Sequence, residues 1–317
     1  MSASPLVSVV VPNYNHAPHL PQRLDSILNQ TFQDFELILL DDASTDDSRR
    51  ILTEYATRCG ARCHFNPVNS GSPFKQWNRG ARQARGTYIW IAESDDSASP
   101  DFLSTLVGLL ESDPSLVLAY CRVDAIDENG RPSPGGPIGL YSTPRWQADH
   151  IADGSEECAR YMSFQATIPN ASAVVFRRST LEKIGWAEEG LRYCGDWITW
   201  ARLIGTGRLA FTSRVLSQFR IHSGSLGSRS SGRGIYHREA ARVVAEILQR
   251  FPPPPHTRDA AVQGRVGEWI SYCLNDPRRF LDADGREVRK ALAQVDPNLT
   301  RRILRSILYQ CYQRIVD

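Results

Sequence analysis

Three short apolar, β-branched runs in the first hundred residues each end in a cluster of polar side chains. They cover Leu6 to Val11, Phe35 to Leu40 and Thr87 to Ala92, and their composition is typical of buried β-strands. The segments between them carry apolar residues at helical spacing. This alternation predicts an α/β fold whose mostly parallel sheet is flanked by helices. The polar strand ends should then lie together at one edge of the sheet.

Local signals place the helices and one further strand. Ser44 with Asp47 resembles a capping box for the second helix, and Ser72-Pro73 marks the start of the third. Ser99-Pro100 predicts another helix start, and Cys63 to Phe65 reads as a short additional strand.

An acidic run, Glu93-Ser94-Asp95-Asp96, directly follows the third apolar run. In open α/β sheets, ligands bind at the carboxyl ends of the strands. Carboxylates this close repel one another unless a cation or a proton offsets their charge, and a hard divalent metal that holds a diphosphate would do so. The alternative for such a run is a solvated acidic turn.

The usual phosphate-binding loops are missing from this chain. Pro12-Asn13-Tyr14-Asn15 follows the first strand where a Rossmann-like dinucleotide-binding protein carries Gly-x-Gly-x-x-Gly, and there is no Gly-x4-Gly-Lys-Ser/Thr loop. A phosphate must be held in another way, and a metal is the simplest choice.

Composition narrows the class of protein. The 317 residues suffice for one large domain with an appendage. The net charge of +2 and the lack of a recognition motif predict no nucleic acid partner. The seven scattered cysteines favour the reduced thiols of a cytoplasmic protein. No charged leader is followed by an apolar run, and no apolar stretch reaches the ~20 residues that span a bilayer.

Four motifs together resemble family 2 glycosyltransferases of the GT-A fold. The match runs from about residue 6 to about residue 228 and rests on Ser8-Val9-Val10-Val11-Pro12-Asn13-Tyr14-Asn15, Leu39-Leu40-Asp41-Asp42-Ala43-Ser44-Thr45-Asp46, the acidic run, and Gly195-Asp196-Trp197. The resemblance implies an inverting transfer of a sugar from a nucleoside-diphosphate donor, with UDP-sugars favoured, usually with Mn or Mg.

The resemblance also implies a set of nucleotide contacts. Asp42 matches the aspartate that accepts a hydrogen bond from the base, while Asp41 either contacts the nucleotide or supports the loop. Pro12 and Tyr14 match the exit of the first strand, where Tyr14 offers a ring for stacking on a base or packs within the loop. Asn78 matches a position near the nucleotide sugar.

Further positions carry the implied metal, donor and acceptor roles. Asp95 matches the ribose contact and Asp96 the metal ligand, and His222 completes the metal shell. Asn170 is expected to contact the donor sugar, and Arg220 is expected to meet the diphosphate.

Asp196 matches the catalytic base of the family. It lies at the start of a predicted helix, where an aspartate also serves as an N-cap, and the two roles are compatible. The Gly/Ser/Arg-rich residues 227 to 234 are expected to close over the donor as a lid.

The sequence divides into a catalytic domain, residues 1–233, and a helical C-terminal extension, residues 234–317, with a Pro-rich break at 252–255. One side of the last predicted helix is apolar. That side either packs on the catalytic domain or makes a peripheral contact with the inner face of a membrane, where lipid-linked acceptors reside. The residues on it are Ile303, Leu304, Ile307, Leu308, Cys311 and Ile315.

The expected partners are a nucleotide-sugar donor and a glycan or lipid-linked acceptor, as in polysaccharide, O-antigen or other glycoconjugate synthesis. Two alternatives remain. One is a metal-dependent nucleotidyltransferase on a similar sheet. The other is a catalytically silent carbohydrate-binding protein, although intact Asp42, Asp95, Asp96 and Asp196 argue against silence.

Overall fold

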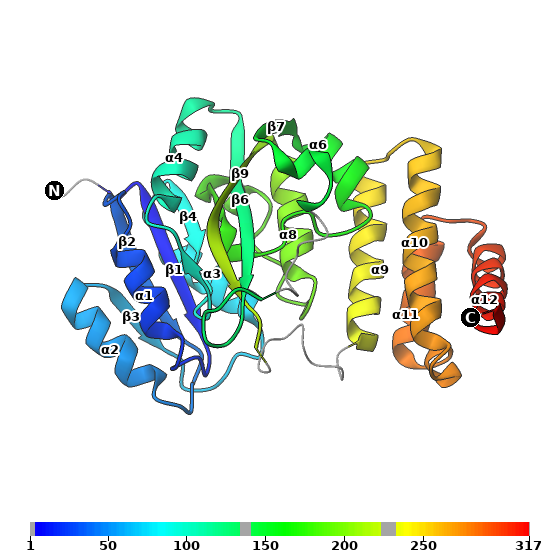
Figure 1. The fold of residues 1–317 in the computed structure, drawn as a ribbon, viewed down its shortest axis with the longest axis horizontal. Helices are drawn as coiled ribbons and strands as arrows, with labels where there is room; N and C mark the ends of the chain where they lie inside the picture. The colour runs from blue at the N-terminus through cyan, green and yellow to red at the C-terminus, as the bar shows by residue number, and fades with distance from the viewer. Residues whose placement is uncertain (1–3, 134–140, 223–232, 317) are drawn as a thin grey trace.

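A mixed sheet packed between helices is followed by a stack of helices that leads away from it (Figure 1). The computed structural model describes residues 4–133, 141–222 and 233–316. The strands are β1 (Val7–Asn13), β2 (Phe35–Asp41), β3 (Arg62–Phe65), β4 (Tyr88–Ile91), β5 (Ser97–Ala98), β6 (Leu116–Ile126), β7 (His150–Asp153), β8 (Val174–Arg177) and β9 (Arg208–Arg220). The longer helices are α1 (Leu20–Leu28), α2 (Ser48–Cys59), α3 (Pro73–Gln83), α4 (Phe102–Ser112), α8 (Gly195–Ile204), α9 (Arg233–Arg250), α10 (Pro255–Cys273), α11 (Ala283–Ala293) and α12 (Leu299–Val316), and the short ones are α6 (Gly154–Glu157) and α7 (Arg178–Lys183).

The sheet has the predicted, mostly parallel arrangement in its N-terminal half. Its strand order is β3-β2-β1-β4-β8-β6-β9-β5, with β7 paired to β9. The first four strands run parallel, with Val7 aligned to both Phe35 and Tyr88. β8 enters antiparallel between β4 and β6, and β6 runs parallel to β9. The carboxyl ends of β1, β2 and β4 therefore share one edge.

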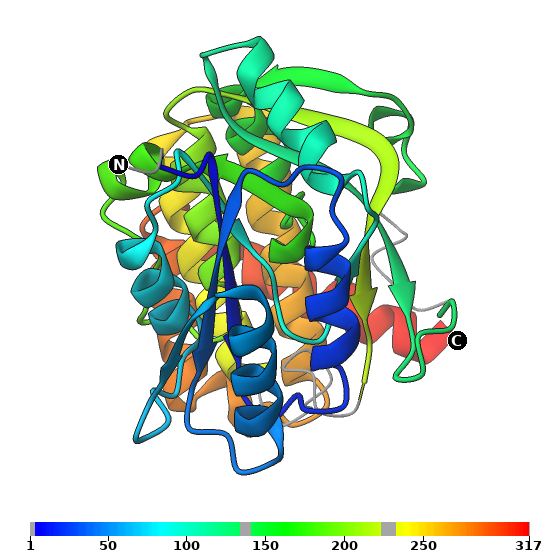
Figure 2. The same cartoon turned by 90° about the vertical axis from the view of Figure 1, so that its left-hand side faces the viewer.

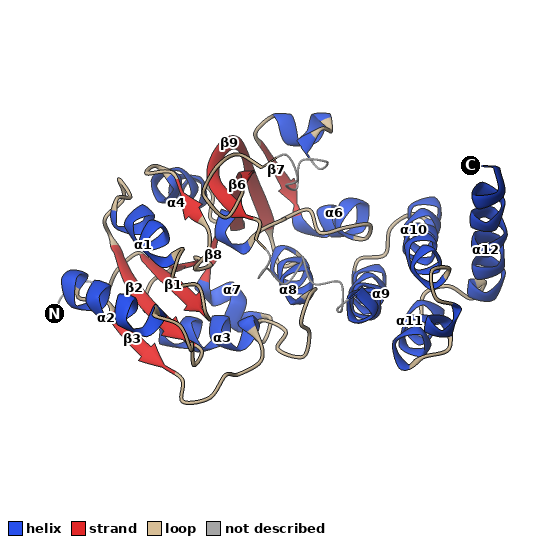
Figure 3. Ribbon diagram, turned by 60° about the horizontal axis from the view of Figure 1, so that its bottom comes forward, coloured by secondary structure: helices blue, strands red, loops and turns tan. Residues whose placement is uncertain are grey.

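Helices cover both faces of the sheet, so its strands are buried on both sides and read as unbroken apolar runs. Figure 2 shows α1 and α2 on one side of the central strands and α3 on the other, and Figure 3 shows the strands enclosed between helices. Val10, Leu40 and Trp90 have no exposed surface. The parallel α/β prediction is confirmed.

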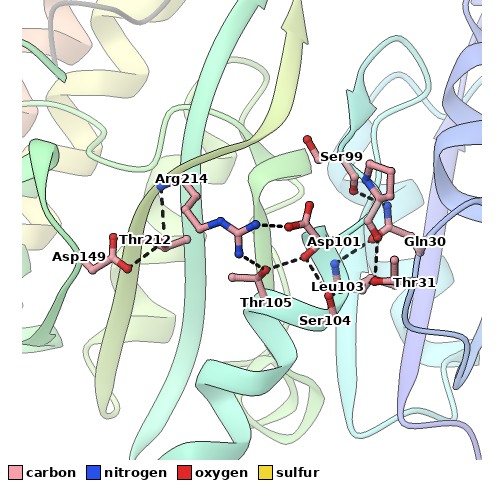
Figure 4. A network of polar contacts seen from close by, with 11 residues as sticks. Gln30, Thr31, Ser99, Asp101, Leu103, Ser104, Thr105, Asp149, Thr212 and Arg214 are labelled. Atoms are coloured by element: carbon pink, nitrogen blue, oxygen red, sulfur yellow. Dashed lines mark hydrogen bonds and ion pairs between the residues drawn. The ribbon is translucent and has the colours of Figure 1, made fainter.

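The helix predicted at Ser99-Pro100 begins later, because a polar network fixes its start (Figure 4). Asp101 is the N-cap residue of α4. The Gln30 amide donates to the Ser99 carbonyl at 2.7 Å and accepts from the Leu103 N–H at 2.9 Å. Arg214 of β9 binds the Asp101 carboxylate. Contacts that are distant in sequence therefore set this boundary.

The capping box expected at Ser44 and Asp47 is wrong. Asp47 is the N-cap residue of α2, without a side-chain cap hydrogen bond. The Ser44 hydroxyl instead accepts from the Asn15 N–H at 2.9 Å and from the Asn13 amide at 3.1 Å. Ser44 therefore ties the loop after β2 to the loop after β1.

The C-terminal helices stack outward from α8 in the order α9, then α10 with α11, then α12 (Figure 1). The apolar side predicted for the last helix is only partly covered. Ile303 is buried, whereas Leu304 and Leu308 are 57% and 71% exposed. Among the described residues, no helix is both long and apolar enough to cross a bilayer. The expected lid falls mostly outside the described residues, and its last two residues begin α9.

Two helical glycines should respond oppositely to substitution by alanine. A Cβ at Gly80 of α3 would lie 2.2 Å from Val10 Cγ1, whereas a Cβ at Gly108 of α4 has no neighbour within 4 Å. Gly80→Ala should lower the free energy of unfolding by about 1–3 kcal/mol through overpacking. Gly108→Ala should raise it by about 0.5–1 kcal/mol. Urea unfolding of both variants tests the close approach of α3 to β1, and equal effects would contradict it.

Candidate active site

The loops after β1, β2 and β4 meet at the carboxyl edge of the sheet. Asn13 pairs with Asp41 in the register of β1 and β2, and the Asp42 N–H donates to the Asn13 carbonyl at 2.9 Å. The Ala92 N–H donates to the Val10 carbonyl at 2.8 Å, which brings the acidic run beside the exit of β1.

Asp95 forms a compact group with two histidines from distant segments. Its Oδ2 lies 3.0 Å from Nε2 of His222, which follows β9. One ligand atom each from His16, Asp95 and His222 lies within 4.8 Å of the other two. Two imidazoles and one carboxylate are a suitable donor set for a divalent transition metal, so these residues fit the metal that the sequence predicts.

The surroundings keep two of the nearby imidazoles neutral. Burial lowers the pKa of His16, and burial also lowers the pKa of His19 to about 4, with Arg220 adding to the effect. The ring centroids of His16 and His222 lie 5.4 Å apart in an edge-to-face arrangement, and His16 Nδ1 lies 2.8 Å from Ser94 Oγ. Neutral imidazole is the form that binds a metal.

Asp96 points into the interior and does not belong to this group. Its carboxylate accepts hydrogen bonds from the Ser172 hydroxyl at 2.6 Å, the Asn170 amide at 3.0 Å and the Arg220 N–H at 3.0 Å. The candidate metal ligand in the acidic run is therefore Asp95, whereas the sequence predicts Asp96. Asp95 faces the candidate metal position, and Asp96 joins the acidic loop to the segment before β8 and to the end of β9.

Glu93 and Arg23 reduce the charge repulsion in the acidic run. Burial, with the nearby Asp95 charge, raises the pKa of Glu93 to about 8, and its carboxyl accepts from the Trp77 indole at 2.7 Å. The fully buried Arg23 donates to the Glu93 carbonyl at 2.9 Å, and its guanidinium lies 4.9 Å from the Trp90 ring centroid. At neutral pH, the run thus consists of one protonated and two charged side chains above a buried cation.

Arg220, which the sequence predicts to meet the diphosphate, supports the loop with all three of its guanidinium nitrogens. Its Nε donates to the Asp95 carbonyl at 2.7 Å, and its two terminal nitrogens donate to the Asp127 carbonyl at 2.8 Å and to Gln22 at 2.6 Å. A buried guanidinium that is engaged on all three nitrogens holds its neighbours in place. Asn170 has a similar role through its hydrogen bond to Asp96.

The two aspartates after β2 are buried and bonded to their own loops. Five hydrogen bonds from Asn66, Ser70 and Gln76 reach the Asp42 carboxylate. Asp41 accepts from the Asn13 amide at 3.0 Å and from the Ser44 N–H at 3.1 Å. Asp42 therefore shapes the segment after β3, and a contact with a base would require one of its present donors to move.

The remaining predicted nucleotide contacts lie in different places. Pro12 is buried in β1, and Tyr14 is 46% exposed at the strand edge, where its ring can stack. Asn78 is turned away from that edge. Its amide exchanges two hydrogen bonds of 2.9 Å with the backbone of Ala187 and donates to Glu189 at 2.7 Å. Asn78 thus fixes the loop that precedes α8.

Asp196 lies in the first turn of α8, as the sequence predicts, but Cys194 is the N-cap residue. Asp196 Oδ1 accepts from the Trp197 N–H at 2.7 Å. Burial raises the pKa of Asp196 to about 6, a value suited to a group that takes up a proton near neutral pH. This pKa is compatible with the general-base role that the sequence predicts for Asp196.

Helix α3 connects Asp196 to the acidic run. A Cβ at Gly195 would lie 2.3 Å from the Phe74 ring, so the start of α8 lies directly against α3. The Phe74 and Trp77 rings are 5.0 Å apart, and Trp77 donates to Glu93. The segment of the candidate base and the acidic run thus both contact the pair of aromatic rings on α3.

The sequence reading missed His16, His19, Arg23 and Ser172. A signal for the histidines was present, because they are three residues apart just after the first strand. Arg23 was also visible as a cation among the apolar positions of α1. Ser172 gave no signal, since its partners Asp96 and Glu93 lie far away in the sequence.

These features define an α/β fold with a candidate metal site at its strand edge and a separate carboxylate at the start of α8. The family model described as glycosyl transferase family 2 matches residues 8–185, more than half of the chain. The chain therefore belongs to that family.

Relatives and solved structures agree with this assignment. An uncharacterised glycosyltransferase of Rickettsia typhi is 25% identical over 220 residues, which cover 69% of this chain and 65%, less than two thirds, of the relative. S. aureus TarS 1-349 in complex with UDP-GlcNAc matches with a TM-score of 0.70 at 17% identity, over 97% of this chain and 91% of that one. A mannosyltransferase from Pyrobaculum calidifontis in complex with GDP-Man and Mn2+ matches at 0.57 and 16%, over 98% and 88%. At such identities the structural likeness shows the GT-A fold alone.

Replacing Asp95 and Asp96 separately by alanine tests which of the two carboxylates binds the metal. Asp96→Ala leaves three buried donors without their acceptor and should lower the free energy of unfolding by about 2–4 kcal/mol. Asp95→Ala should leave it within about 1 kcal/mol but weaken Mn2+ binding more than about tenfold. Urea unfolding and Mn2+ titration without donor measure the two effects, and the reverse pattern would restore Asp96 as the ligand.

Proposed function

We propose that this chain is a metal-assisted, inverting glycosyltransferase that moves a sugar from a nucleoside-diphosphate donor to an acceptor hydroxyl. The observation that carries the proposal is the pairing of two separate sites on one GT-A sheet. One is the group of His16, Asp95 and His222 at the strand edge, and the other is Asp196 at the start of α8. Membership of the family supports the same reaction class.

His16, Asp95 and His222 are the residues that would hold the metal. A bound divalent ion supplies Lewis acidity, which stabilises the negative charge on a departing diphosphate. The protein prepares this position in advance, because buried Arg23 offsets negative charge in the acidic run and the histidine rings are packed together. Such preorganisation avoids reorganisation during the reaction.

Asp196 would take the proton from the acceptor hydroxyl. An alcohol is a weak nucleophile until a base accepts its proton, and a positioned carboxylate contributes about 10²- to 10⁴-fold. In this proposal Asp196 acts on the face of the sugar opposite the departing diphosphate, so the hydroxyl attacks from that face. A single displacement of this kind inverts the anomeric carbon.

The nucleotide would lie over the loops after β1 and β2. Tyr14 offers the exposed ring, while Pro12, Asp41 and Asp42 form the buried frame beneath it. A UDP-sugar is the favoured donor, which the UDP-GlcNAc complex of TarS supports, although another neighbour binds GDP-Man with Mn2+. The acceptor is a glycan or a lipid-linked glycan in polysaccharide or other glycoconjugate synthesis.

The test of this function is release of nucleoside diphosphate from UDP-, GDP- and dTDP-sugars with and without Mn2+. Transfer should require an acceptor, and its rate should rise with pH through about 6 and then level off. The sign follows from Asp196, because burial raises its pKa to about 6 and only the ionised form accepts a proton. Asp196→Asn should lose transfer by at least about 10²-fold.

Nucleotide binding serves as the control. Asp196→Asn should keep the wild-type affinity for nucleoside diphosphate with Mn2+, since the residue takes no part in the strand-edge site. Retained transfer in Asp196→Asn would remove it as the base. Release of pyrophosphate would favour the nucleotidyltransferase, and no turnover with any donor would favour a silent carbohydrate-binding protein.

We also propose that the exposed side of α12 makes a peripheral contact with an anionic membrane surface. Leu304, Leu308 and Tyr312 are exposed at four-residue spacing, and Arg301 and Arg305 are exposed beside them. The helix contains no acidic residue. An apolar stripe with flanking arginines is typical of helices that lie at a lipid interface.

Liposome co-sedimentation tests the contact. The unaltered chain should sediment with vesicles that contain phosphatidylserine more than with neutral vesicles, because apolar burial and arginine attraction add. Replacing Leu304, Leu308 and Tyr312 together by serine should abolish sedimentation. Leu281→Ser, at a leucine that is 68% exposed elsewhere in the extension, is the matched control. Equal recovery of all three proteins in the supernatant would refute the membrane contact.

A further inference from the structure

The carboxylate of Glu239, a residue of the C-terminal extension, is buried against the loop that leads into α8. Glu239 is on α9 and is 1% exposed. Its oxygens accept hydrogen bonds from three consecutive backbone N–H groups, those of Arg192 at 2.9 Å, Tyr193 at 2.7 Å and Cys194 at 3.1 Å. One side chain of the extension thus accepts hydrogen bonds from all three backbone amides of residues 192–194.

These amides lead directly into the candidate base. Cys194 is the N-cap residue of α8, and Asp196 follows two positions later. A helix N-terminus carries partial positive charge and unpaired N–H groups, which favour a carboxylate. Of the three amides that donate to Glu239, that of Cys194 belongs to the helix terminus, and the side chain of Cys194 itself makes no cap hydrogen bond. The position of Asp196 is therefore coupled to that of α9.

The loop cannot shift without a cost in free energy. Among the described residues, no cation forms an ion pair with Glu239, so its buried charge depends on the three N–H groups. Asn78 fixes the other end of the same loop through Ala187. The segment before α8 is thus held by α3 on one side and by α9 on the other.

We propose that Glu239 is a positioning residue that sets the orientation of Asp196, which makes the C-terminal extension part of the transferase active site. This inference rests on the proposed function, in which Asp196 is the base. It assigns the extension a role in transfer that is separate from any contact of α12 with a membrane.

The charge of Glu239 also acts on Asp196. Burial raises the pKa of Asp196, and the negative charge of Glu239 raises it further. The other titratable or charged groups at this corner include Arg192, Tyr193 and Cys194 of the loop, Tyr236 of α9, and Arg265 and Glu268 of α10, which form an ion pair at 2.8 Å. Removing the Glu239 charge should therefore move the acidic limb of the rate profile to lower pH.

The experiment compares Glu239→Gln with Glu246→Gln in the full chain. Glu246 lies two turns further along α9 and accepts from Arg202 of α8 at 2.7 Å and 2.9 Å, and Arg202 also bonds Glu188 at 3.1 Å. The backbone amides of residues 192–194, however, donate to Glu239 and not to Glu246. Glu239→Gln should lower kcat about 10- to 100-fold, because a small displacement of a catalytic group has effects of this size. Donor KM and UDP affinity with Mn2+ should stay within about twofold. Glu246→Gln should match the unaltered protein.

Each outcome decides a different point. A kcat for Glu239→Gln equal to that of Glu246→Gln, or an unmoved acidic limb, overturns the positioning role. If Asp196→Asn keeps full transfer, the proposed function fails; if it is inactive while Glu239→Gln is unimpaired, only this inference fails. Should Glu239→Gln not fold, hydrogen exchange in the unaltered protein decides. The amides of residues 192–194 should exchange as slowly as those inside α8, and fast exchange overturns the proposal.

Discussion

The repulsion among three carboxyl groups at the end of β4 is the constraint on which the site depends. Two unit charges 4 Å apart repel by about 4 kcal/mol at an effective dielectric constant near 20. The fold gives each carboxyl a different environment. Glu93 is protonated at neutral pH because burial raises its pKa, Asp96 accepts three hydrogen bonds, and Asp95 lies beside His222. Arg23 adds a positive charge beneath them. Asp95 is thereby left as the carboxylate of the run that faces the candidate metal position.

The same arrangement occurs at three places around the site: a buried carboxylate accepts hydrogen bonds from backbone N–H groups of another segment. Asp42 holds the segment after β3, Asp96 holds the end of β9, and Glu239 holds the entry to α8. Each fixes a loop that would otherwise be free to move, and rigid support of this kind keeps reactive groups in place. Several acidic residues that a motif assigns to ligands therefore also serve as framework, and Asp95 and Asp196 are the ones to which we assign the chemistry in our proposal.

The sequence predicted the parallel strands and their shared polar edge because these follow from short apolar runs, which are local. It predicted the start of α8 near Asp196 for the same reason. It assigned the metal to Asp96 and not to Asp95, because adjacent side chains in a loop point in different directions that only distant partners determine. The partners of Asp96 lie at Asn170, Ser172 and Arg220. Local spacing likewise placed the cap of α4 too early, since Arg214 and Gln30 fix that boundary from far along the chain.

The candidate site combines two groups of residues that come from different segments of the chain. The strand-edge group is built mainly from loops of the first hundred residues, whereas Asp196 takes its position from the loop held by Asn78 and Glu239. The described contact between the two parts runs through α3, where Phe74 packs against Gly195 and Trp77 binds Glu93. Because packed interiors transmit displacement, a shift of α9 should displace the candidate base, Asp196, more than it displaces the residues at the strand edge. On this structure, changes in the extension should alter transfer while nucleotide binding persists.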